Sequence, residues 1–171
     1  MVSSGRDENY IAWWWHYGKR ELARGMWLLD FGTMYNGYCC DISRPFVVGR
    51  PSQEQKDAFK VFLEAQDPTQ RTVREVALAY DVDRTAIGVL KEKWGIDDCG
   101  AGHGVGLEVN EWPFLGDHKI TDDEDCRDTR LRENMVISIE SSINITEKGE
   151  LQIKDQFVIT KTGCESLNDI P

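Results

Sequence analysis

The sequence predicts an α+β fold, because hairpin-linked strands stand at both ends of the chain and the helices are grouped between them. An Asn36-Gly37 dipeptide between alternating residues is the strongest short-range signal for a two-residue β-hairpin. Apolar residues at helical spacing follow this hairpin. Two strand-like runs, residues 135–140 and 151–160, then flank a turn at residues 147–150. A doubly wound α/β sheet would instead alternate strands and helices throughout.

The segments before the helices have the composition of strands. Residues 10–16 form an unbroken aromatic run, and residues 27–31 have the apolar character of a buried strand that leads into the hairpin. Residues 38–48 follow the turn directly. We therefore expect them to form the return strand of the hairpin.

Two helices are expected in the middle of the chain. Ser52 with Gln55 three residues later makes a capping box at the start of the first helix. We expect this helix to end at Pro68, because proline lacks the backbone N–H that continues a helix. The second helix is expected over residues 83–94, where apolar side chains recur on one stripe.

Composition limits the class of protein. A chain of 171 residues suits a single domain, residues 1–171, with a substantial core. The net charge of −10 argues against a nucleic-acid binder and against an anionic membrane surface. The chain has no apolar run of the ~20 residues that a membrane span needs, and its start lacks the layout of a signal peptide. Five cysteines, an odd number, suit a reducing compartment, so we expect a cytoplasmic protein.

The predicted hairpin places two carboxylates on one face. With Asn36 and Gly37 as its loop, Gly32 lies opposite Asp41, and Asp30 points to the same side as Asp41. Such diagonal neighbours have Cβ atoms roughly 7–8 Å apart or somewhat less, which suits metal ions held between them. The alternative is that the two acids lie on a solvated face of the hairpin.

Two further residues with metal-binding side chains occur in distinctive settings. His103 lies between glycines, which let the backbone come close to a site. Glu140 ends an apolar strand where a buried face would call for another apolar residue, and a carboxylate there is costly unless it is paired or bound to a cation. Together with Asp30 and Asp41 these residues form a set suited to Mn²⁺, Fe²⁺, Co²⁺ or Zn²⁺.

These motifs, taken in order, resemble those of the pita-bread hydrolases, a family that includes aminopeptidase P, prolidase, methionine aminopeptidase and creatinase. The resemblance covers nearly the whole chain. It rests on these motifs, in chain order: Asp30-Phe-Gly, Tyr35-Asn-Gly-Tyr38, Asp41-Ile-Ser-Arg44, Gly102-His-Gly-Val-Gly-Leu107, Glu133-Asn-Met-Val-Ile-Ser-Ile-Glu140 and Phe157-Val-Ile-Thr160. It implies a pita-bread fold and a hydrolase in which a metal-bridging water attacks an amino-terminal peptide bond.

The resemblance also implies roles for individual residues. Asp30, Asp41, His103 and Glu140 match the family's metal ligands, and Glu140 thereby belongs to its catalytic centre. His16 resembles the histidine that contacts substrate near the scissile bond, which implies a catalytic and substrate-binding role.

Three departures from the family's pattern stand out. Lys154 occupies the place of the glutamate that bridges both ions, and Asp155 faces the opposite side of the same strand. Our hypothesis is that the Lys154 ammonium lies near Asp30 and replaces the charge of the first cation. Asn110 stands where a second pocket histidine is expected, and can hydrogen-bond a substrate carbonyl without moving protons. The chain also lacks the strands and helix that open the family's fold, which implies either a fragment or a homodimer that covers the exposed edge.

Three functions are consistent with this sequence. The first is an Xaa-Pro-peptidase-like metallohydrolase of small amino-terminal peptides or amides, with one divalent ion at best. The second is a metal-independent, creatinase-like hydrolase or a lyase that acts on a small metabolite, which the changes at Lys154 and Asn110 favour over an ordinary peptidase. The third is a non-catalytic binding module of the same fold.

Overall fold

The computed structural model describes residues 2–4, 24–95, 101–116, 119–121, 124–145 and 149–168. Within these residues, eight strands join one sheet in the order β1-β2-β5-β11-β10-β6-β7, with β12 paired to β11. The strands of this sheet are β1 (Val2–Ser4), β2 (Gly25–Phe31), β5 (Ile42–Val48), β6 (Gly102–Gly104), β7 (Glu111–Leu115), β10 (Val136–Ile145), β11 (Gly149–Ile159) and β12 (Cys164–Ser166). The remaining elements are β3 (Met34–Tyr35), β4 (Tyr38–Cys39), α1 (Gln53–Thr72), α2 (Ala79–Trp94), β8 (Lys119–Thr121), β9 (Glu124–Asp125) and the short 3₁₀ helix η1 (Cys126–Asp128).

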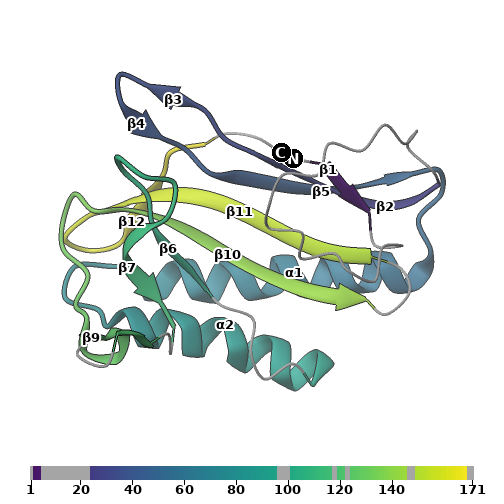
Figure 1. Cartoon of the computed structure of the whole chain (residues 1–171). Coiled ribbons are helices and arrows are strands. Elements are labelled where there is room, and N and C mark those ends of the chain that lie inside the picture. Colours follow the sequence, from purple (N-terminus) through teal and green to yellow (C-terminus); the bar gives the residue numbers. More distant parts are fainter. Residues whose placement is uncertain are drawn as a thin grey trace.

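The two helices lie side by side along one face of the sheet, beneath β10 and β11, and the β3–β4 hairpin extends beyond one end of it (Figure 1). Strands joined by hairpins and helices collected on a single face confirm the predicted α+β class. The opposite face of β10 and β11 carries no helix among the described residues. This open face is the one that presents the candidate site.

The predicted hairpin is confirmed together with its register. Asn36 and Gly37 both have positive φ angles, 51° and 87°, as a type I′ turn requires. Tyr35 pairs with Tyr38 in β3 and β4. The same register continues into the main sheet, where Asp30 of β2 pairs with Ser43 of β5.

Helix α1 confirms the predicted capping box but not the predicted end. The Ser52 side chain accepts from the backbone N–H of Gln55, and the Gln55 side chain accepts from the N–H of Ser52. Pro68 does not end the helix, which continues to Thr72. The lost N–H costs one helical hydrogen bond, whereas the buried stripe of the helix runs across this point to Thr69 and keeps the last turn packed against the core.

Helix α2 begins at Ala79, four residues before the expected start at Asp83. The first turn contains Ala79 and Val82, both fully buried, so packing extends the helix toward its N-terminus. Leu78 precedes the helix and provides no side-chain cap. The sequence therefore carries no local signal for this start.

Strands β10 and β11 separate the core from the open face by strict alternation. Odd-numbered residues pack against the helices in two apolar clusters, and they include Ile137, Ile139, Leu151, Ile153, Phe157 and Ile159. Even-numbered residues, among them Glu140 and Lys154, point the other way because successive side chains in a strand alternate between its faces.

Some predictions fall outside the described residues. The aromatic run of residues 10–16, with His16, is one of them, and the first half of the turn at residues 147–150 is another, whereas Gly149 and Glu150 open β11. Among the described residues, neither helix is sufficiently long and apolar to cross a bilayer.

Candidate metal centre

Four strands place their site residues in one row across the sheet. Asp30 of β2 pairs with Ser43 of β5, Ser43 pairs with Lys154 of β11, and Lys154 pairs with Glu140 of β10. Residues directly opposite each other in antiparallel strands point to the same face. The row therefore brings three charged side chains to the open face, although Ser43–Lys154 is the only position at which β5 and β11 pair in the described structure.

Asp41 and His103 complete the group beside this row. Asp41 lies two residues before Ser43, and His103 pairs with Ser138, two residues before Glu140. The alternation of each strand directs both side chains toward the row. The alternative of a solvated acidic face is wrong for Asp41, which is only 4% exposed.

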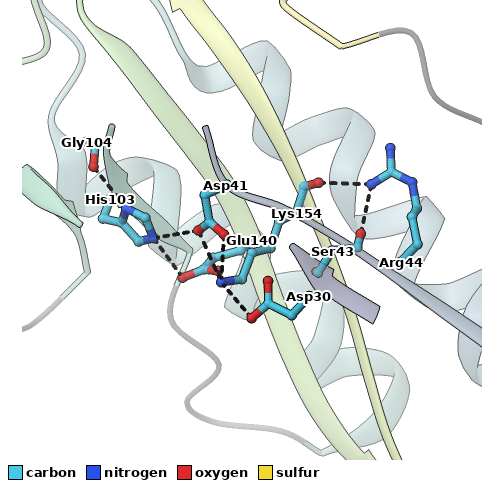
Figure 2. A network of polar contacts seen from close by, with 8 residues as sticks. All are labelled: Asp30, Asp41, Ser43, Arg44, His103, Gly104, Glu140 and Lys154. Carbon is cyan, nitrogen blue, oxygen red and sulfur yellow. Dashed lines mark hydrogen bonds and ion pairs between the residues drawn. The ribbon is translucent and has the colours of Figure 1, made fainter. Parts of the chain in front are cut away.

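Lys154 lies at the centre of the acidic residues (Figure 2). Its Nζ is 3.0 Å from Glu140 Oε2, 3.1 Å from Asp41 Oδ2 and 3.6 Å from Asp30 Oδ2. The hypothesis of contact with Asp30 is confirmed, but Asp41 and Glu140 lie closer to the ammonium. The lysine side chain is 11% exposed, so these ion pairs are largely shielded from water.

His103 is held so that one ring nitrogen faces two carboxylates. Its Nδ1 is 2.9 Å from the carbonyl oxygen of Gly104. A carbonyl only accepts, so Nδ1 carries a hydrogen, and in the neutral ring Nε2 carries the lone pair. Nε2 is 3.3 Å from Asp41 Oδ2 and 3.4 Å from Glu140 Oε1. It is buried and has no hydrogen-bond partner among the described residues.

This arrangement fits a divalent cation. A lone pair that faces two carboxylate oxygens is unfavourable, so this position calls for a positive charge, which either a proton on the ring or a metal ion can supply. Asp41, His103 and Glu140 offer ligand atoms within 4.8 Å of one another, a spacing that suits ligands about 2 Å from a common ion. The set of two carboxylates and one imidazole suits Mn²⁺, Fe²⁺, Co²⁺ or Zn²⁺.

The charges in the site perturb one another. Burial lowers the pKa of His103, but the carboxylates of Asp41 and Glu140 outweigh it and raise the pKa to about 9. Burial likewise opposes the charged form of Lys154, whose pKa nevertheless lies above its ordinary value because Glu140, Asp41 and Asp30 surround it. A metal ion at His103 would take the place of the proton that the ring otherwise holds.

The pKa values of the three site carboxylates shift in two directions. Burial would raise the pKa of Asp41 and of Glu140, but His103 and Lys154 outweigh burial and lower both values. The pKa of Asp30 is raised by burial, which Lys154 offsets only in part. Asp41 and Glu140 are therefore the more strongly stabilised carboxylates of the group.

Glycines on both sides of His103 allow its strand to lie close to its neighbours, as the sequence predicted. A Cβ atom at Gly102 would collide with the backbone carbonyl of Ser138 on β10, and one at Gly104 would collide with the backbone of Trp112. Gly102 also has a φ of 136°, a conformation that side chains rarely adopt. The position of His103 thus depends on glycine at both neighbouring positions, 102 and 104.

Asp155 does not take over the role of a ligand, because it lies on the other face of β11, as predicted. Its carboxylate accepts a hydrogen bond from Arg44 Nη2 at 2.6 Å. Arg44 Nη1 donates to the backbone carbonyls of Ser43 at 2.8 Å and of Lys154 at 2.9 Å. One guanidinium therefore ties β5 to β11 at the point where the two strands meet.

Replacement of Arg44 by lysine is expected to lower the free energy of unfolding by about 2 kcal/mol, because a single ammonium cannot reproduce this fork of charge-assisted hydrogen bonds. Urea denaturation measures the change. Arg71→Lys is the matched control, since Arg71 pairs with Asp67 on the exposed surface of α1. Exposed helix pairs contribute only about 0.3–0.5 kcal/mol. Equal effects of the two substitutions would contradict the role given to Arg44.

The sequence pattern indicated no role for Arg44, Ser43 or Ser138. The two serines are fully buried on the site face, and their hydroxyls have no hydrogen-bond partner among the described residues. The alternation of side chains along a strand was a signal for both serines. Each lies two residues from a site carboxylate and therefore points to the same face as that carboxylate. Of the remaining predicted residues, Asn110 lies on an exposed loop, and His16 is outside the described residues.

Solved structures share this fold over the entire chain. The prolidase of Pyrococcus furiosus superposes with a TM-score of 0.83 and 31% identity, and covers 100% of this chain with 49% of its own length. An X-Pro aminopeptidase from Thermotoga maritima gives a TM-score of 0.85 at 30% identity, with 100% of this chain and 47% of that chain covered. The predicted pita-bread fold is confirmed.

The chain belongs to metallopeptidase family M24, whose family model matches residues 1–161. A curated relative, the Xaa-Pro dipeptidase of Pyrococcus furiosus, is 35% identical over 152 residues, which span 86% of this chain and 41% of that protein. The chain thus spans about two fifths of the length of this relative.

Proposed function

We propose that the protein is a hydrolase of small amino-terminal peptides of the Xaa-Pro type, with one divalent ion held by Asp41, His103 and Glu140. The observation that carries this proposal is the buried Nε2 of His103, which has no hydrogen-bond partner among the described residues and faces two carboxylates. Two of the relatives are named an Xaa-Pro dipeptidase and an X-Pro aminopeptidase, which supports the choice of substrate.

The residues of this chain prepare the site before substrate enters. The carbonyl of Gly104 fixes the ring of His103, and Lys154 holds the carboxylates of Asp41 and Glu140 in place. A divalent ion bound there would lower the pKa of a bound water and polarise the carbonyl of the substrate. His16 and Asn110 are the proposed contacts to the substrate.

Release of proline from an Xaa-Pro dipeptide tests the proposal. We expect the chain to release proline when supplied with Mn²⁺ or Co²⁺, and to lose this activity in EDTA. His103→Ala is expected to lower kcat/KM by about 100-fold or more, because loss of even an outer partner of a metal ligand costs 10–100-fold. The matched control is Lys161→Ala at an exposed position, which is expected to keep the activity of the parent chain.

Two results would contradict the proposal in different ways. Absence of proline release with every cation tested would refute the hydrolase. Proline release that persists in EDTA would refute the metal and favour the second candidate, a metal-independent hydrolase or lyase of a small metabolite. A specific observation favours this second candidate, since Lys154 already balances part of the acidic charge without an ion.

A further inference from the structure

Asp41 and Glu140 each contact both His103 Nε2 and the Lys154 ammonium. Glu140 directs Oε1 to His103 Nε2 at 3.4 Å and Oε2 to Lys154 Nζ at 3.0 Å. Asp41 Oδ2 lies 3.3 Å from the same histidine nitrogen and 3.1 Å from the same ammonium. Figure 2 shows His103 on one side of these carboxylates, with Lys154 Nζ and Asp30 on the other. Carboxylates shared in this way are typical of sites that hold two cations side by side.

We infer that the Lys154 ammonium permanently fills one of the two cation positions, so that the centre holds one divalent ion per chain, on the His103 side. This inference rests on the proposed function in one respect, namely that Asp41, His103 and Glu140 bind an ion. It adds that Asp30 forms an ion pair with Lys154 and is not a ligand of the metal ion.

Charge supports this assignment. Three carboxylates and one ammonium leave a net charge of −2 when His103 is neutral, and one divalent ion neutralises that charge. A second divalent ion would leave the buried centre at +2 and would need the space that the ammonium occupies. Buried charge without compensation is strongly unfavourable.

The strand register explains why the Lys154 ammonium stays between the carboxylates. Lys154 is paired on one side with Ser43 and on the other with Glu140, and its backbone carbonyl accepts from Arg44. Its side chain therefore starts between the strands that carry Asp30, Asp41 and Glu140. The ammonium cannot leave the three carboxylates without exposing them as an unpaired cluster.

The stoichiometry of bound metal tests the inference. The full chain, freed of metal and titrated with Co²⁺ alone, is expected to bind one ion by calorimetry and by elemental analysis after dialysis. Lys154→Glu is expected to bind two, because it removes the internal cation and supplies a further ligand. Lys161→Glu makes the same charge change at an exposed position and is expected to bind one.

A second pair of variants keeps the test independent of how well Lys154→Glu folds. Asp30→Asn is expected to keep the single ion, whereas Asp41→Asn is expected to lose it. Two ions in the unaltered chain, one ion in folded Lys154→Glu, or loss of the ion in folded Asp30→Asn would each overturn the inference. None of these results would remove the proposed peptide hydrolase activity or its dependence on a metal ion. No bound ion in either the unaltered chain or folded Lys154→Glu would refute the metal of the proposed function as well.

Discussion

Replacement of Lys154 by methionine is expected to lower the free energy of unfolding by about 3 kcal/mol or more in the presence of EDTA. Methionine keeps an unbranched apolar stem of the same number of atoms, from Cβ to Cε, but removes the ammonium from among Asp30, Asp41 and Glu140. Removal of one partner from a buried ion pair costs about 3–5 kcal/mol, because the remaining charge stays buried without compensation. Urea denaturation at neutral pH measures the loss.

The control for this substitution is Lys161→Met, at an exposed position that is expected to change stability by less than about 0.5 kcal/mol. Addition of Co²⁺ is expected to recover part of the stability of Lys154→Met, since a cation that binds only the folded state stabilises it. If Lys154→Met were as stable as the parent chain, the ion pairs at the centre of the site would contribute nothing to folding.

Replacement of Gly102 by alanine is expected to lower the free energy of unfolding by about 3 kcal/mol, and to reduce metal binding in whatever fraction remains folded. The added Cβ atom would collide with the carbonyl of Ser138, and the φ of 136° is strained for any residue with a side chain. Relief of the collision requires β6 to move away from β10. His103, the next residue in β6, would move with it.

Gly88→Ala is the matched control, because a Cβ atom at Gly88 meets nothing within 4 Å in the middle of helix α2. Alanine there is expected to raise the free energy of unfolding by about 0.5–1 kcal/mol. Thermal denaturation of the two variants against the parent chain compares them directly. Opposite signs are expected, and a neutral result for Gly102→Ala would mean that β6 is free to shift.

Much of the site could be predicted from local sequence. The Asn36-Gly37 turn sets the register of the hairpin, and that register alone places Asp30 and Asp41 on one face. The same alternation separates Glu140 and Lys154 from the apolar residues of their strands and puts Asp155 on the far side. These features depend on period and turn chemistry, which are visible in a single chain.

The features that could not be predicted depend on contacts between distant segments. Nothing in the local pattern indicates that Ser43 meets Lys154, so the role of Arg44 at that crossing was missed. The early start of α2 and the passage of α1 through Pro68 are both decided by burial against the sheet, which overrides local propensity. The identity of the cation nearest Asp30 was inferred only because the family's pattern has a glutamate at that position.

The single row that joins Asp30, Ser43, Lys154 and Glu140 has a consequence for how the protein loses its site. Each member belongs to a different strand, and Asp41 and Lys154 are 113 residues apart in the chain. No hairpin or helical segment that unfolds or folds alone retains the group, so the site exists only in molecules whose central strands are all assembled. The fraction of chains with a bound divalent ion would therefore report the global unfolding equilibrium. A metal titration at increasing urea concentration would then measure how cooperatively the protein unfolds.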